Sequence, residues 1–210
     1  MIDLLKIKKH VDEALKILEY FPMETMSSEK FNEQLEKVMI QFEYTTIELR
    51  RLCEENQMPV KHEKSNIKIY HAKEIYGSIE ITDNGWLHIC LNTLLPNCKS
   101  HTNSIYISDS ITRLIDRFIR YGGALPFYEK AFLAIIERCN LENRKSFDHD
   151  NKGFKAIQNA LKGRLFADDN QFSLSLGLFT EIDDEIACHI YVMPENETAD
   201  FFYLRHGDGL

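Results

Sequence analysis

The sequence lacks the features that mark fibrous, membrane-spanning or secreted proteins. Its 210 residues include only nine glycines and five prolines, which excludes a collagen-like chain. No apolar run approaches the roughly 20 residues that a bilayer-spanning helix needs. We expect no signal peptide, because the N-terminus has no basic flank followed by an apolar core. With 44% hydrophobic and 28% charged residues, the composition is typical of a folded globular protein.

Cysteine is scarce and unpatterned. The five cysteines are scattered and never spaced as Cys-x-x-Cys: Cys53, Cys90, Cys98, Cys139 and Cys188. An odd, scattered set favours reduced thiols and a cytoplasmic protein, and a zinc site has no motif to support it. The eight histidines form no metal-binding repeat, and no phosphate-binding glycine loop is present.

Positive charge is outnumbered by negative charge overall but concentrated in one region. The net charge is −8, which argues against nucleic-acid binding. Residues 86–167, however, carry 12 basic and 7 acidic side chains, whereas residues 168–210 carry 1 basic and 10 acidic ones. The middle region can therefore offer a basic surface, although solvated helix faces explain the same counts.

The N-terminal part predicts a helical hairpin over residues 1–57. Apolar residues recur at helical spacing over 2–21, and a second helix is expected over 28–56 with Ser27 as its N-cap and Met26 as part of a hydrophobic staple. The second helix has a heptad-like seam of Phe31, Leu35, Val38, Phe42, Thr45, Leu49 and Leu52. This seam packs either within the chain or against a second copy.

The remaining chain, residues 67–210, predicts short strands and helices after a polar linker. Strands are expected at 67–69, 76–81 and 86–91, the last two joined by an Asn-Gly turn, and at 171–180 and 187–193; helices are expected at 105–121 and 150–161. The last two strands look like an antiparallel hairpin with a charged turn at 181–185. Residues 130–137 fit a buried strand or a helix equally. The predicted fold class is α+β, with the helical hairpin followed by a mixed α/β domain.

Four carboxylates in this second part could carry chemistry. Asp148 and Asp150 lie where a helix is expected to begin, and Asp168 and Asp169 lie on the return path toward the same region. Converging carboxylates repel one another, and a divalent cation such as Mg²⁺, which prefers hard oxygen ligands, is the usual reason to keep them together. The alternative is that these residues simply cap a helix and form a turn.

The combination of motifs resembles the catalytic segment of the RusA family of Holliday junction resolvases. The matching pattern is Asp148-x-Asp150-Asn151, Lys155, Asn159-Ala160-Leu161, Gly163 and Asp168-Asp169-x-Gln171. It covers roughly 60 of the 210 residues, from Ala131 to Met193, and would fit a branch of bacterial mobile-element proteins that keeps this segment.

The resemblance implies an Mg²⁺-dependent endonuclease that acts on branched DNA as a homodimer. Asp148, Asp150 and Asp169 would hold the metal, with Asp168 beside them, and a lysine would contact the scissile phosphate. The family's lysine position is occupied here by Phe154. Lys155 follows one residue later, which on a helix turns the side chain by about 100°.

Several basic residues could contact DNA phosphates. They are Arg113, Arg117, Arg120, Arg138, Arg144, Lys145, Lys152, Lys155, Lys162 and Arg164. The acidic C-terminal region would repel DNA unless it faces away. The competing prediction is a non-catalytic DNA- or protein-binding module that retains the RusA-like fold, or a structural partner that assembles through the Phe31–Leu52 seam.

Overall fold

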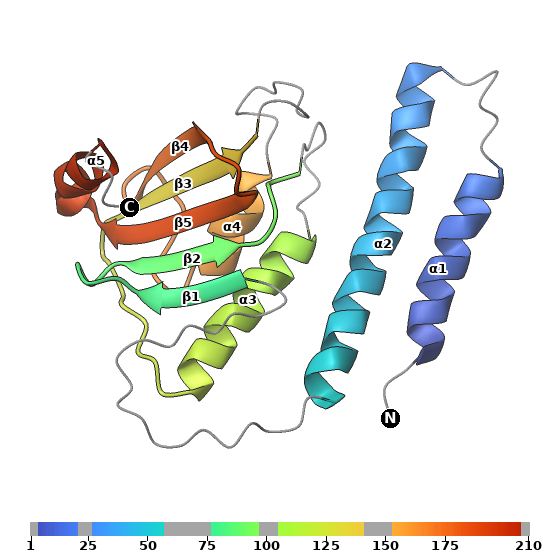
Figure 1. Cartoon of the computed structure of the whole chain (residues 1–210), viewed down its shortest axis with the longest axis horizontal. Helices are drawn as coiled ribbons and strands as arrows, with labels where there is room; N and C mark the ends of the chain where they lie inside the picture. The colour runs from blue at the N-terminus through green and yellow to red at the C-terminus, as the bar shows by residue number, and fades with distance from the viewer. Residues whose placement is uncertain (1–3, 21–26, 57–76, 97–104, 141–152, 207–210) are drawn as a thin grey trace. The chain divides into compact units, whose positions relative to one another are not determined.

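The computed structural model describes residues 4–20, 27–56, 77–96, 105–140 and 153–206 (Figure 1). The chain divides into two compact units, Met1–Ser65 and Asn66–Leu210. The first is a helical hairpin and the second a mixed five-stranded sheet with helices. The fold class is therefore α+β, as the sequence predicts.

The first unit consists of α1 (Leu4–Glu19) and α2 (Ser28–Asn56), packed as an antiparallel pair. The predicted N-cap is confirmed, because the Ser27 hydroxyl accepts the backbone N–H of Lys30 at 3.5 Å. Between the helices, His10 Nδ1 lies 2.9 Å from Gln41 Oε1, and its ring stacks on Tyr44 with 5.3 Å between the centroids. The described residues exclude Met26, so its predicted staple lies outside them.

The predicted seam of α2 is buried only in part. Val38 and Thr45 are buried, whereas Leu35, Phe42 and Leu49 remain exposed. These three residues are spaced seven apart, so they lie along one stripe of the helix. A single partner helix buries one side of an amphipathic helix, which explains why α2 keeps a second apolar stripe at its surface.

The described strands of the second unit form a five-stranded sheet in the order β1-β2-β5-β3-β4. Its strands are β1 (Gly77–Ile81), β2 (Leu87–Leu91), β3 (Ala131–Cys139), β4 (Leu174–Ile182) and β5 (Ala187–Pro194). Only β3 and β4 run parallel, and the other neighbours are antiparallel. The undecided segment 130–137 is thus a strand. The strand expected at residues 67–69 lies outside the described residues.

The predicted Asn-Gly hairpin is confirmed between β1 and β2. The backbone N–H of Thr82 donates to the Trp86 carbonyl at 2.9 Å, which closes the loop. Gly85 has a φ of +79°, a conformation that residues with a Cβ rarely adopt. Its position in the turn therefore favours glycine.

The predicted antiparallel hairpin of residues 171–180 and 187–193 is wrong. The segments do form β4 and β5, but β3 lies between them and pairs with both. Every residue of β3 from Ala131 to Glu137 is buried, so this strand needs neighbours on both edges and layers on both faces. β4 also runs on to Ile182, which shortens the predicted charged turn.

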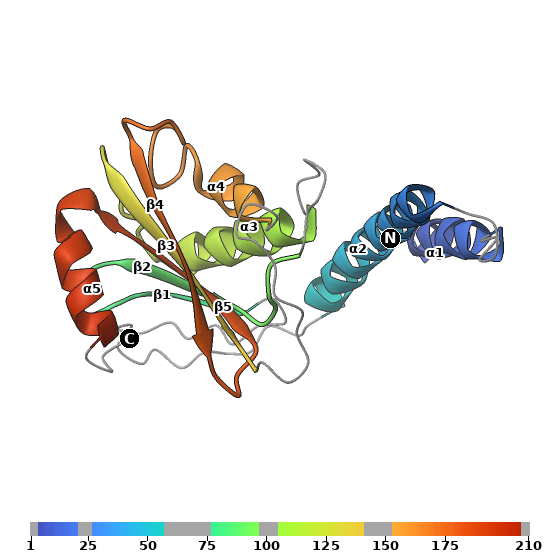
Figure 2. The same ribbon diagram turned by 90° about the horizontal axis from the view of Figure 1, so that it is seen from above.

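Helices lie on both faces of the sheet, as Figure 2 shows. α3 (Ile105–Arg120) and α4 (Phe154–Leu161) pack on one face around aliphatic residues such as Ile111, Leu133 and Ile190. The short 3₁₀-helix η3 (Glu195–Glu197) and α5 (Thr198–His206) follow β5, and α5 packs Phe201 on the opposite face beside Trp86. Helix α5 could not be predicted from the sequence, because its apolar residues show no helical periodicity. None of the described helices could cross a bilayer.

Candidate functional site

The structure describes only part of the predicted acidic site. Asp168, Asp169 and Lys155 are described, whereas Asp148 and Asp150 lie outside the described residues. The predicted convergence of Asp148 and Asp150 with Asp169 therefore stays a prediction.

Asp168 and Asp169 lie beside α4, within reach of two lysines from that region. Lys155, in the first turn of α4, pairs with Asp169 Oδ2, and Lys162, just after the helix, donates to Asp169 Oδ1 at 3.0 Å and also pairs with Asp168. Gly163, whose φ is +74°, reverses the chain after the helix. The turn therefore brings Asp168 and Asp169 back beside α4, the helix that precedes them in the chain.

The lysines set the electrostatics of this cluster. Hydrogen bonds from Lys155 and Lys162 hold the pKa of Asp169 far below its usual range. The bond from Lys162 likewise lowers the pKa of Asp168, and Asp168 in turn raises the pKa of Lys162. Two carboxylates therefore face two ammonium groups, and the described part of the cluster is formally neutral.

The one-residue displacement of the lysine has a structural reason. Phe154, at the position of the family's lysine, packs against the aliphatic core under the sheet. Lys155 is exposed and turned by about 100° around the helix, and this rotation takes its ammonium group to Asp169. A basic group thus reaches the predicted carboxylate despite the departure from the family's pattern.

The described donors suit Mg²⁺ in type but not in charge. Asp168 and Asp169 offer carboxylate oxygens, the hard ligands that Mg²⁺ prefers. Each described carboxylate already accepts a lysine, so the attraction for a cation has to come from Asp148 and Asp150. A two-residue site made of Asp168 and Asp169 alone does not fit a resident cation.

Most of the basic side chains predicted to face DNA are paired with carboxylates where the structure describes them. Arg113 Nε lies 2.8 Å from Asp109 Oδ2, and Arg164 Nη1 lies 2.8 Å from Asp116 Oδ1. Arg138 Nε lies 3.2 Å from Glu181 Oε2. Arg144, Lys145 and Lys152 lie outside the described residues. These ion pairs reduce the positive charge that the middle region offers to a phosphate backbone.

Several acidic residues near the C-terminus also have partners. Arg205 Nε donates to Glu181 Oε1 at 2.9 Å, and Trp86 Nε1 donates to Glu197. Both contacts lie on the face that carries α5, opposite α3 and α4. Acidic groups in the C-terminal region would repel DNA. The sheet therefore separates some of them from the predicted site.

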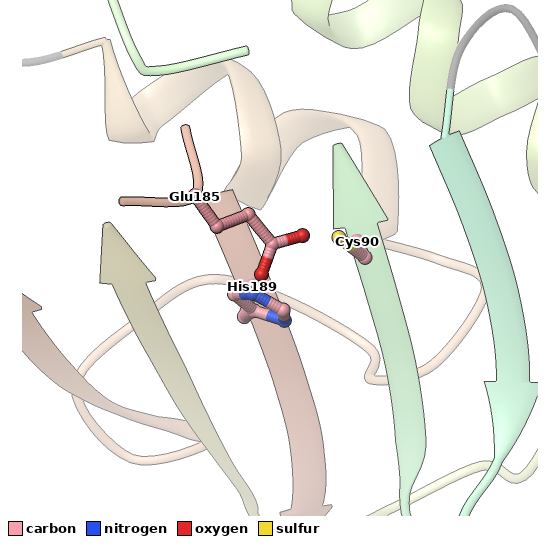
Figure 3. Close-up of side chains that lie close together, drawn as sticks. All are labelled: Cys90, Glu185 and His189. Atoms are coloured by element: carbon pink, nitrogen blue, oxygen red, sulfur yellow. The ribbon is translucent and has the colours of Figure 1, made fainter. Parts of the chain in front are cut away.

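The α5 face holds a second cluster that sequence reasoning missed. One ligand atom from each of Cys90, Glu185 and His189 lies within 4.8 Å of the other two (Figure 3). Cys90 of β2 is directly opposite His189 of β5, and Glu185 precedes β5. Gly77 of β1 packs so closely that a Cβ there would lie 1.9 Å from the Cys90 carbonyl oxygen.

Histidines and a tyrosine extend this cluster along the sheet. His88 Nδ1 lies 2.8 Å from Glu80 Oε1, and His88 Nε2 lies 3.0 Å from His189 Nδ1. The His88 ring also stacks on Tyr191 with 4.3 Å between the centroids. Burial lowers the pKa of His189 to about 4 and raises the pKa of the Cys90 thiol.

The only sequence signal for this cluster was the two-residue alternation of strands. Alternation placed His189 and Tyr191 on the same face of a predicted strand. Nothing in the sequence showed that β2 pairs with β5, and that pairing brings Cys90 to His189 from about 100 residues away. The expected β4–β5 hairpin pointed to a different neighbour.

Comparisons with known proteins give a family but no activity. The model of a family of unknown function, DUF6100, matches residues 3–206. Neither the search of curated proteins nor the search of solved structures finds a match.

Proposed function

The chain belongs to this family of unknown function, and we propose from its own residues that it is an Mg²⁺-dependent endonuclease acting on branched DNA. The proposal rests on the resemblance to the RusA family and assigns the metal to Asp148, Asp150 and Asp169, with Asp168 beside them. A cytoplasmic location would agree with the reduced thiol of Cys90.

The observation that carries the proposal is the contact between Lys155 and Asp169. A phosphodiester-cleaving site needs carboxylates for a cation and a basic group for the phosphate at one place. The lysine displaced from the family's position still reaches the carboxylate that the motif spacing selected. In this role Lys155 and Lys162 hold Asp169 ionised, and either lysine could turn toward a phosphate that enters the site.

Bound Mg²⁺ would supply an activated water and charge stabilisation at the departing oxygen. The residues of the chain position the substrate. Lys155 and Lys162 are both exposed, so their ammonium groups are accessible to a phosphate from solvent. The neutral balance of the described cluster makes Asp148 and Asp150 the residues on which cation binding depends.

The proposed assembly is a homodimer, because a four-way junction requires two symmetric cuts. The exposed stripe of Leu35, Phe42 and Leu49 on α2 supports a second copy as its partner. Its seven-residue spacing is the repeat by which two helices pack as a coiled coil. Size-exclusion chromatography with light scattering tests this part, and Phe42→Glu should shift a dimer to a monomer.

A cleavage assay tests the activity. The purified full chain is incubated with linear, flap and four-way DNA in Mg²⁺, and products are resolved on a denaturing gel. We expect cleavage of branched DNA, its loss in Asp150→Asn and Asp169→Asn, and its retention in Asp200→Asn, a matched change on exposed α5. Wild-type cleavage by Asp150→Asn would exclude this mechanism.

A non-catalytic DNA- or protein-binding module remains the second candidate, and the ion pairs of Asp168, Asp169 and the described arginines favour it. Thermal unfolding separates the two functions. An Mg²⁺-dependent rise in Tm in wild type that disappears in the Asp148→Asn/Asp150→Asn double variant supports the metal site. An unchanged Tm supports the binding module.

A further inference from the structure

A chain of hydrogen bonds on the α5 face links two histidines to the Glu80 carboxylate. The Glu80 carboxylate can only accept, so His88 Nδ1, at 2.8 Å, carries a proton. A neutral His88 ring then offers Nε2 as an acceptor, and His189 Nδ1 donates to it across 3.0 Å.

This arrangement leaves His189 Nε2 with a lone pair and no proton. His189 is only 8% exposed, and its Nε2 is a buried atom that finds no hydrogen-bond partner among the described residues. An unpaired buried polar atom carries a desolvation cost that a bound ligand would offset. A neutral imidazole nitrogen held this way is the form in which histidine binds metal ions.

Two further metal-ligand side chains lie beside His189. Cys90 reaches the site because β2 pairs with β5, and one ligand atom from each of Cys90, Glu185 and His189 lies within 4.8 Å of the others. A backbone hydrogen bond from the Glu185 N–H to Asp183 Oδ1, at 3.1 Å, shapes the turn that carries Glu185. Figure 3 shows the three side chains gathered from the ends of the two strands.

We infer that Cys90, Glu185 and His189 bind a divalent transition-metal ion, with Zn²⁺ the best fit. Thiolate, imidazole and carboxylate are the ligand types that Zn²⁺ uses, whereas Mg²⁺ avoids sulfur. Three protein ligands leave a fourth tetrahedral position for water or another ligand. The site is separate from the described part of the proposed nuclease site, which lies beside α4 on the opposite face of the sheet.

Neighbouring residues support the ion without ligating it. His88 and Glu80 position the His189 ring, as outer partners of metal-bound histidines commonly do. Arg138 carries the opposing positive charge on this face, but its Nε lies 3.2 Å from Glu181 and 4.0 Å from Asp183. The negative charges of Glu181 and Asp183 therefore offset the repulsion between Arg138 and a bound cation.

Metal titration of the chelator-treated full chain tests the inference. We expect Zn²⁺ to raise Tm, and Co²⁺ to give the intense thiolate-to-cobalt absorption of a cysteine-bound ion. Both signals should be lost in Cys90→Ser and in His189→Gln. Glu80→Gln should weaken Zn²⁺ binding by about 10- to 100-fold. The amide can donate a hydrogen bond to His88 Nδ1, and His88 Nε2 would then carry the proton and donate it to His189 Nδ1.

Matched variants separate this site from non-specific binding and misfolding. Cys53→Ser removes a cysteine from α2 in the other unit, and His206→Gln removes an exposed histidine from α5; both should retain the signals. Circular dichroism checks that each variant folds. No Co²⁺–thiolate absorption in wild type, or the same absorption in folded Cys90→Ser, would overturn the inference. Mg²⁺ should not compete with Zn²⁺, and competition would also count against it.

Discussion

The two faces of the sheet differ in how much chemistry they carry. The face under α3 and α4 is packed mainly with aliphatic side chains, and its buried carboxylate, Glu137, accepts the backbone N–H of Leu95 at 2.9 Å. The α5 face combines an aromatic cluster around Phe201 with a buried row of His88, His189 and Tyr191. One face therefore supplies mainly stability, and the other combines stability with groups that can bind an ion.

The aliphatic face should show the largest loss of stability on truncation. Ile111→Ala removes a fully buried side chain of α3, and we expect about 2–5 kcal/mol lower free energy of unfolding. Denaturant titration followed by circular dichroism measures this value. Ile119→Ala on the same helix, where the side chain is 50% exposed, should change stability by less than about 0.5 kcal/mol. Equal losses would contradict the assignment of this face.

Removing the hydrogen bond between Trp86 and Glu197 on the α5 face should cause the next largest loss of stability. Trp86→Phe keeps most of the buried ring but removes the hydrogen bond from Nε1 to Glu197. Bonds to charged groups contribute about 1.5–3 kcal/mol, so a loss in that range is expected in the same titration. Asp200→Asn, on the exposed side of α5, serves as the control. A neutral result for Trp86→Phe would mean that Glu197 does not anchor this layer.

The histidine row should make the stability of the metal-free protein depend on pH. The pKa of His189 is about 4 when folded and about 6.5 when unfolded, so the unfolded chain binds more protons between these values. Stability is therefore complete above pH 6.5 and decreases as the pH falls toward 4, by up to about 1.4 kcal/mol per unit. Denaturation with a chelator present at several pH values measures the slope.

Removing the ionisable ring should flatten this dependence. His189→Gln should lose less stability on acidification than wild type, and His206→Gln should follow wild type. If wild type and His189→Gln lost the same stability on acidification, the His189 ring would have the same pKa in the folded and unfolded states, which would contradict this prediction.

The lysine–aspartate cluster should contribute least. Lys162 and the partly exposed Asp168 pair at the surface, and solvent-screened ion pairs contribute little to stability. Lys162→Met should therefore lower the free energy of unfolding least among these variants, and added salt should reduce the difference. A larger, salt-independent loss would mean that the cluster is structural, which would weaken its proposed catalytic role.

Local sequence patterns predicted the helices and strands themselves better than they predicted which strands lie next to each other. Helical spacing gave α1, α2 and α3 within a few residues, and the Asn-Gly turn gave the β1–β2 hairpin. The order of the strands depends on contacts between distant segments, so alternation in 171–180 and 187–193 could not reveal that β3 separates them. Nor could it bring Cys90 to His189.

The two candidate sites likewise differ in how far local sequence patterns could predict them. Motif spacing selected Asp169 and Lys155, which do meet, because both lie in one short local segment around α4. The Cys90, Glu185 and His189 cluster has no linear motif. It exists only through strand register, which depends on the burial of both sheet faces and is therefore not encoded near any one of the three residues.

The strand order has a consequence for the synthesis of the protein. β5 is the last of the described strands in chain order, yet it is the one that joins β2 to β3. The β1–β2 hairpin and the β3–β4 pair consequently have no direct strand contact and stay separate until β5 arrives. On the ribosome, the sheet cannot close before residues 187–194 have emerged from the exit tunnel. A nascent chain stalled earlier would expose two unpaired strand edges to chaperones.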